Sequence, residues 1–292
     1  MYYIVYGLLY TFSLLPLRVL YLVSDLAYFI LYYVAGYRQE LVLNNLLIAF
    51  PEKSGEERKK IAKQFYLNFT DTFIESIKMI SISKDEVVRR SHCDFELINQ
   101  LIDNGSNLHV MVGHQFNWEF ANLVYAMHIR IPFVGIYMPV NNKIIDKIFL
   151  KVRERYGTIM ISAKDFKHKM HTVFSEQYML ALAADQNPGN PAGAYWLKFF
   201  SKPAPFVTGP GKGAVKNNTA VVFVAFEKPR RGYYSYKATL VAANGASHTP
   251  EQLTVLYKNI LEDTIRKNPS NYLWSHRRWR HEWREGYDKV IG

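Results

Sequence analysis

Apolar residues along the chain follow two different periods. From Ser54, a favourable helix N-cap with Glu57 three residues later, apolar positions recur at helical spacing and predict one long amphipathic helix. These positions are Ile61, Phe65, Phe69, Phe73 and Ile77. Further along, short apolar or β-branched runs are typical of strands. They cover residues 108–112, 133–137, 179–184, 221–226 and 234–241.

Helical stretches alternate with these strands. They cover residues 117–128, 143–156, 208–217 and 250–268. Alternation of this kind predicts an α/β fold in which helices flank a mixed central sheet. The chain shows no internal repeat.

The first 37 residues differ from this pattern. The run from Met1 to Leu17 has no charge, Arg18 and Asp25 interrupt it, and the run from Leu26 to Tyr37 is again apolar and aromatic. Neither run comfortably reaches the roughly 20 residues that a spanning helix needs. We therefore predict a membrane anchor over residues 1–37, spanning or interfacial, and a catalytic domain over residues 38–292. The alternative is a buried helical hairpin of a soluble core.

Charge and composition narrow the class of partner. The net charge of +11 suits an anionic membrane surface, a phosphorylated lipid, nucleic acid or an acidic carrier protein. Aromatic residues reach 15%, which favours the membrane. The first basic cluster follows the anchor and predicts that the domain lies on the cytoplasmic side. With Cys93 as the only cysteine, neither an intrachain disulfide nor a cysteine-rich zinc site is possible.

A candidate catalytic pair follows the strand at residues 108–112. Gly113 and His114 form the turn into a helix that begins near Asn117, and Glu119 lies in the first turn of that helix. Two side chains five residues apart within one helix would point about 140° apart, so they meet only if His114 precedes the helix. We predict that Glu119 reaches back to His114. The same spacing between His171 and Glu176 has no preceding strand or glycine and indicates a solvated surface.

Several blocks in order resemble the bacterial lipid A late acyltransferases, the lauroyl and myristoyl transferases of the lysophospholipid acyltransferase superfamily. The resemblance covers nearly the whole chain. The blocks are Asn45-Leu46, Ala49-Phe50-Pro51-Glu52, Tyr66-x-Asn68-Phe69, the His114 to Glu119 block, Tyr137-x-Pro139, Arg153-x-Arg155-x-Gly157, Asp185-Gln186, Phe199-Phe200 and Trp274-Ser275-His276-Arg277-Arg278.

The resemblance implies a glycerolipid-acyltransferase-like fold and a site at the cytoplasmic face of the inner membrane. It implies transfer of an acyl chain from acyl carrier protein to a hydroxyl of a phosphorylated glycolipid, with no cofactor and no metal. His114 is then the general base, because a neutral imidazole can take a hydroxyl proton near pH 7. Glu119 would orient its ring and stabilise the imidazolium.

The resemblance also supplies substrate-binding candidates. Arg153 and Arg155 are expected to bind phosphate or to support the catalytic pair, unless they form an exposed helix face. Asp185 and Gln186 follow a strand, where open α/β sheets place functional groups, although a turn-capping role is the alternative for Asp185. The family usually carries arginine where this chain has Met138, so the acceptor headgroup is open. A glycine-rich segment, Thr208 to Gly213, lacks the ending of a nucleotide loop and predicts a helix start near lipid phosphate.

The C-terminal segment mixes tryptophan with arginine. Trp274, Trp279 and Trp283 alternate with basic residues from Arg277 to Arg284, which suits a membrane interface. Nucleic acid is excluded as the partner, because it would leave the anchor and the histidine site unexplained. Two further hypotheses stay open: an acyltransferase acting on another membrane lipid, such as an aminolipid or a glycosylated phospholipid, and a lipid-binding homologue without activity.

Overall fold

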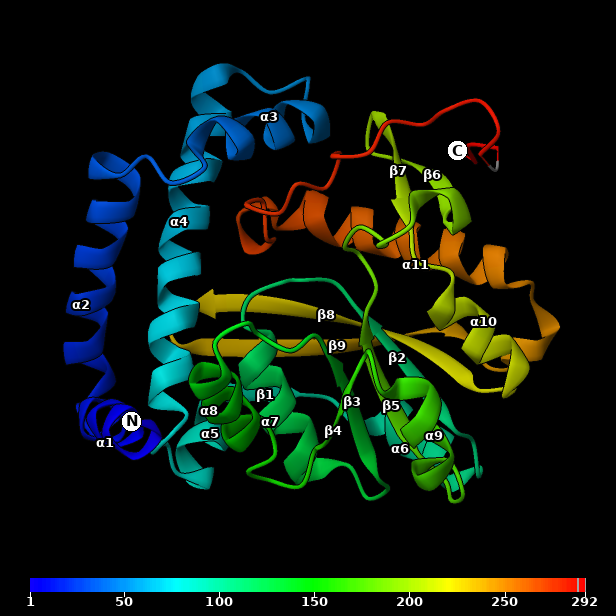
Figure 1. Cartoon of the computed structure of the whole chain (residues 1–292), viewed down its shortest axis with the longest axis horizontal. Helices are drawn as coiled ribbons and strands as arrows, with labels where there is room; N and C mark the ends of the chain where they lie inside the picture. Colours follow the sequence, from blue (N-terminus) through cyan, green and yellow to red (C-terminus); the bar gives the residue numbers. More distant parts are fainter. Residues whose placement is uncertain (288, 292) are drawn as a thin grey trace.

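The computed structural model describes residues 1–287 and 289–291, and these build a seven-stranded mixed sheet with helices on both faces (Figure 1). The strand order is β1-β9-β8-β2-β5-β3-β4, in which β8 and β9 are antiparallel and every other pair is parallel. The strands are β1 (Ser91–Cys93), β2 (Leu108–Val112), β3 (Phe133–Tyr137), β4 (Ile159–Ser162), β5 (Met179–Ala183), β8 (Ala220–Arg230) and β9 (Tyr233–Ala242). The predicted α/β fold with a mixed central sheet is confirmed.

The helices cover the sheet on two sides and form a group of their own at the N-terminus. They are α1 (Tyr2–Ser13), α2 (Leu17–Phe29), α3 (Gln39–Ala49), α4 (Gly55–Lys78), α5 (Lys84–Arg90), α6 (Glu96–Asp103), α7 (Trp118–His128), α8 (Lys143–Arg153), α9 (Phe166–Val173), α10 (Gly209–Lys216) and α11 (Pro250–Lys267). A short π-helical segment, Ile30–Val34, continues α2. The long helix predicted from Ser54 is α4, and its capping box between Ser54 and Glu57 is present.

Strand β2 lies between β8 and β5 and has apolar cores on both of its faces. Successive side chains of a strand point to opposite faces. Met111 therefore packs with Leu261 of α11, whereas Val110 packs with Phe120 of α7. A strand buried on both faces reads as a continuous apolar run, which is why residues 108–112 were recognisable in the sequence.

Two strands of a separate hairpin escaped prediction. They are β6 (Tyr195–Phe199) and β7 (Lys202–Phe206), which pair antiparallel apart from the main sheet. Pro203 and Pro205 lie in β7, and proline has no backbone N–H to donate to a ladder. The hairpin tolerates them because β7 pairs with another strand, β6, along one edge only.

The N-terminal helices pack on the rest of the chain. Figure 1 shows α2 running beside α4 at one edge of the molecule, with α1 across its lower end. In the described part of the chain, one helical stretch, Leu17–Val34, is long and apolar enough to cross a membrane by length and composition. Its buried residues are Leu17, Leu20 and Ser24.

Candidate functional site

Two adjacent parallel strands bring a histidine and an aspartate together. Val112 of β2 lies opposite Ala183 of β5 in the register of the sheet. His114 and Asp185 each follow two residues later, so both emerge at the carboxyl edge of the sheet. This is the edge where open α/β sheets place ligand and catalytic groups.

The side chains of His114 and Asp185 are hydrogen bonded. Nδ1 of His114 lies 2.6 Å from Oδ1 of Asp185, and the backbone N–H of His114 donates to Oδ2 at 2.9 Å. A carboxylate only accepts, so Nδ1 carries the proton of this bond. Nε2, the other ring nitrogen, has no hydrogen bond among the described residues, and 21% of the side chain remains exposed. The ring is thus oriented with a basic nitrogen free.

The charges of this pair stabilise each other. Burial lowers the pKa of His114, but the charge and hydrogen bond of Asp185, together with the charge of Glu119, outweigh burial and raise it above the ordinary 6.5. Burial raises the pKa of Asp185, yet the charge and hydrogen bonds of His114 and a hydrogen bond from Tyr272 lower it to about 2. Asp185 is therefore ionised at neutral pH and favours the protonated imidazole.

Glu119 has different partners from those expected. Its carboxylate accepts hydrogen bonds from Nε of Arg153 at 2.8 Å, from Nη2 of the same arginine, and from Nε1 of Trp118 at 3.1 Å. The prediction that Glu119 orients the His114 ring is therefore wrong in detail, because the carboxylate on Nδ1 belongs to Asp185. Asp185 lies two residues after the neighbouring strand β5, and this position brings its carboxylate into contact with the ring.

Arg153 is the partner that holds Glu119. Burial lowers the pKa of its guanidinium, whereas the hydrogen bonds and charge of Glu119 raise it. Such a two-point pair between arginine and a carboxylate fixes both side chains in orientation as well as in charge. This contact fits one of the two roles expected for Arg153, support of the catalytic pair, and that role stays a prediction.

The turn between β2 and α7 is built by Asn117 and Gly113. Asn117 is the N-cap of α7, and its Oδ1 accepts from the backbone N–H groups of Glu119 and Phe120. A Cβ on Gly113 would lie 2.4 Å from Cδ1 of Leu261 on α11. The absence of a side chain there allows α11 to pack directly against the turn that carries His114.

Among the described residues, the other candidates form no hydrogen bond with His114 or Asp185. Arg155 is exposed and donates to the backbone oxygen of Met79 at 2.8 Å, near the end of α4, which supports a structural role. Gln186 is partly buried in the loop after β5, so substrate contact stays a prediction. Met138 is exposed. His171 and Glu176 are both exposed, in agreement with the surface interpretation.

The C-terminal segment supports the site from behind. Trp274, Arg278 and Trp279 are buried, so the prediction that this segment lies at a membrane interface is wrong for them. The backbone N–H of Leu273 donates to the oxygen of His114 at 3.0 Å, and Tyr272 bonds Asp185. The charge of Arg278 is also inside the protein, where its guanidinium lies 4.3 Å from the centroid of the Phe206 ring.

The same segment also holds the loop that carries Asp185. Arg278 donates to Oδ1 of Asn187 at 3.0 Å, and Nδ2 of Asn187 donates to the oxygen of Arg277 at 2.6 Å. Burial and the charge of Arg278 lower the pKa of His276 to about 4. Its neutral ring accepts from the backbone N–H of Asn187 at 3.4 Å.

An apolar pocket shares Trp118 with the surroundings of His114. Val112 and Trp118 line it, and its wall continues through Ala121, Tyr125, Ala181 and Phe226. The Trp118 ring meets the His114 ring edge to face, with centroids 5.6 Å apart. A base next to an apolar pocket can take a proton from a hydroxyl while a hydrocarbon chain is held nearby.

The glycine-rich segment that begins α10 has a structural explanation. A Cβ on Gly211 would lie 2.4 Å from the oxygen of Pro250, so this glycine allows α10 to pack against α11. Within residues 1–287 and 289–291, no group of three His, Cys, Asp or Glu side chains could hold a metal ion. A lipid phosphate at the start of α10 stays a prediction.

Comparison with known proteins gives a consistent family. The family model described as bacterial lipid A biosynthesis acyltransferase matches residues 1–281. The lipid A biosynthesis palmitoleoyltransferase of Escherichia coli is 25% identical over 247 residues, which are 83% of this chain and 79% of that protein. The lauroyltransferase of the same organism is 23% identical over 246 residues, or 83% and 79%. A lipid A biosynthesis acyltransferase of Haemophilus influenzae is 22% identical over 232 residues, or 79% and 72%.

Proposed function

Because the chain belongs to the bacterial lipid A biosynthesis acyltransferase family, we propose that it moves a fatty acyl chain from acyl carrier protein to a hydroxyl of a lipid A precursor. The observation that carries this proposal is the His114–Asp185 pair beside an apolar pocket. The names of the relatives support both the acyl group and the acceptor. Membrane association and a site at the cytoplasmic face of the inner membrane belong to the same proposal.

His114 acts as the general base. Nε2 takes the proton of the acceptor hydroxyl, and the oxygen attacks the thioester carbonyl of the donor. The tetrahedral intermediate then collapses, the carbon–sulfur bond breaks, and the thiolate leaves with the proton from the imidazolium. Asp185 stabilises the imidazolium between these two proton transfers, as the acid of a serine-hydrolase triad does. No covalent acyl-enzyme is needed.

Glu119 and Arg153 support the base indirectly, through Trp118. Their ion pair fixes the start of α7 and holds Trp118 next to the His114 ring. The charge of Glu119 adds to that of Asp185 in raising the pKa of His114. Their role is to position Trp118, which lines the apolar pocket and contacts the His114 ring.

A donor and acceptor assay tests the proposal. Purified full-length protein is incubated with labelled acyl carrier protein thioester or acyl-coenzyme A, and with a phosphorylated glucosamine-disaccharide lipid, an aminolipid or a glycosylated phospholipid. We expect labelled product from the carrier-protein thioester and the disaccharide. Product from another acceptor alone would move the activity to that lipid, and no product from any combination would favour a lipid-binding homologue.

Met138 motivates the alternative acceptor. It is exposed and stands where the family resemblance leads us to expect an arginine. A thioether cannot donate to phosphate, whereas a guanidinium binds it through a fork of donors. If the acceptor carries phosphate at this position, Met138→Arg will lower KM for the disaccharide while kcat changes little.

A further inference from the structure

The outer face of α2 and of its π-helical continuation, Ile30–Val34, is apolar. Exposed apolar residues recur along it every three or four positions, so they form one stripe that points away from the molecule. They are Val19, Leu22, Val23, Leu26, Phe29, Ile30 and Tyr33. A soluble helix carries charged residues on such a face, and contiguous exposed apolar surface marks a site of association.

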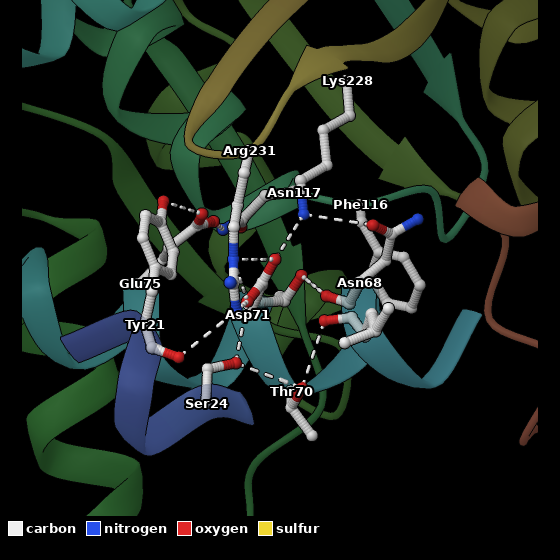
Figure 2. A network of polar contacts seen from close by, with 12 residues as sticks. Tyr21, Ser24, Asn68, Thr70, Asp71, Glu75, Phe116, Asn117, Lys228 and Arg231 are labelled. Carbon is white, nitrogen blue, oxygen red and sulfur yellow. Dashed lines mark hydrogen bonds and ion pairs between the residues drawn. The ribbon is translucent and has the colours of Figure 1, made fainter. Parts of the chain in front are cut away.

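The inner face of α2 is polar. Ser24 donates to Asp71 at 2.7 Å, and Tyr21 donates to Glu75 at 2.7 Å (Figure 2). Arg231 forms salt bridges with both Asp25 and Asp71. Figure 2 shows these groups converging from α2, α4 and the turn after β8. The inner face therefore holds α2 to the domain chiefly through hydrogen bonds to two buried carboxylates of α4, Asp71 and Glu75.

Helix α1 is fastened in the same way. Nζ of Lys78, on α4, donates to the backbone oxygens of Ser13 and Leu15 at 3.0 and 3.1 Å, which satisfies carbonyls left open at the end of α1. Nζ of Lys151 on α8 lies 4.0 Å from the centroid of the Tyr6 ring. Both helices thus rest on helices of the α/β domain.

These contacts are incompatible with a spanning α2. If α2 crossed the bilayer while these contacts held, the residues bonded to it would also lie in the bilayer. Asp71 and Glu75 contact the middle of α2, so their carboxylates would lie near the bilayer centre. Each charged side chain near the bilayer centre costs about 3 kcal/mol on insertion scales. Undocking α2 instead would leave the buried carboxylates of α4 without these partners.

We propose that α1 and α2 lie along one leaflet of a phospholipid bilayer, with the outer stripe of α2 in the acyl region and the α/β domain on the same side. Cations flank the stripe, as expected for an anionic headgroup layer. Arg18 is exposed on α2, and Nζ of Lys63 on α4 lies 5.9 Å from the ring centroids of Tyr32 and Tyr33. This geometry does not depend on the proposed acyl transfer.

Depth measurements test the geometry. In a Cys93→Ala background, single cysteines replace Leu8, Leu22 or Tyr33, and Leu240 on β9 serves as control. The labelled full-length proteins are added to preformed vesicles of phosphatidylethanolamine and phosphatidylglycerol that contain shallow or deep quenchers. We expect the three N-terminal labels at similar, shallow depth and the Leu240 label in water. A deep label at Leu22 with Leu8 and Tyr33 near opposite surfaces would overturn the proposal.

A matched pair of charge variants tests the surface itself. Leu22 is 69% exposed and Leu240 is 41% exposed. Leu22→Glu is expected to lower partition onto these vesicles by about tenfold, whereas Leu240→Glu leaves it unchanged. Thermal melting checks that both variants fold. Equal partition of the two variants contradicts the proposal, and so does a homodimer in detergent that Leu22→Glu dissociates, because the stripe would then bind a second copy.

Discussion

Two buried carboxylates near His114 do different work because their partners differ. Asp185 hydrogen bonds to Nδ1 of the imidazole, so its charge acts directly on the ring whose Nε2 gains and loses the transferred proton. Glu119 is paired with Arg153, which neutralises most of its charge and leaves it a positioning role. The closeness of both carboxylates explains why the pKa of this partly buried histidine is raised when burial alone would lower it.

Asp185→Asn is expected to reduce kcat by roughly 10³-fold, since the amide keeps the shape but not the charge that stabilises imidazolium. The base must be neutral, so the acid limb of the wild-type kcat/KM profile lies above pH 6.5, the ordinary pKa of histidine. Removing the negative charge shifts that limb to lower pH. The pH dependence of initial transfer rates measures both effects.

Glu119→Gln provides the contrast. It removes the salt bridge with Arg153 and leaves the Asp185 bond intact. We expect a smaller displacement of the acid limb than in Asp185→Asn, measured in the same pH series. An equal or larger displacement would make Glu119 the main electrostatic partner of His114.

Part of this site could be predicted from the sequence. The position of His114 in a turn after a strand followed from Gly113 and the apolar run before it. Its partner could not be deduced, because spacing along the chain favoured Glu119, whereas the contact to Asp185 depends on the register between β2 and β5. Pairing between strands 71 residues apart leaves no local signal.

At the scale of elements, one carboxylate joins four of them. Glu75 of α4 accepts from Tyr21 of α2 at 2.7 Å, from Asn117 at the start of α7 at 2.9 Å, and from Tyr234 of β9. Because Asn117 caps the helix that carries Glu119, helix α2 and the turn between β2 and α7 share one polar network.

Glu75→Gln tests that network. The amide group replaces an acceptor by a donor, so one buried donor loses its partner at a cost of roughly 2 kcal/mol in the free energy of unfolding. Urea denaturation measures the change. Glu56→Gln, an exposed residue on the same helix, is the control and is expected to leave stability unchanged.

Elements with a strong local signal were predicted, and those defined by tertiary contacts were not. The strands β2 and β3 and the capping box of α4 match their predicted residues. The C-terminal segment has no regular pattern of its own, and its tryptophans looked like interface residues. The burial of Trp274 and Trp279 depends on packing against Phe199 and Phe200 of the hairpin region, which composition does not reveal.

At the scale of the whole molecule, the proposed membrane geometry assigns charge and apolar surface to the same partner. In that geometry the net charge of +11 attracts the chain to anionic lipid, and the outer stripe of α2 contributes binding that does not depend on charge. Salt screens the first contribution, with a Debye length of about 10 Å at 0.1 M, and leaves the second.

Raising the salt concentration from about 0.05 to about 0.5 M is therefore expected to weaken partition onto phosphatidylglycerol vesicles and to leave partition onto neutral vesicles unchanged. Vesicle co-sedimentation measures both. Complete release from neutral vesicles at any salt concentration would show that charge alone holds the protein to lipid.

The most direct test of the account compares two histidine variants in one acyl-transfer assay. His114→Ala removes the proposed base, and His171→Ala removes an exposed histidine with the same spacing to a glutamate. Initial rates with labelled acyl carrier protein thioester and the preferred acceptor are measured for both proteins and the wild type. The account predicts wild-type rates for His171→Ala and a loss of roughly 10³-fold or more for His114→Ala. Transfer by His114→Ala at the wild-type rate would contradict it.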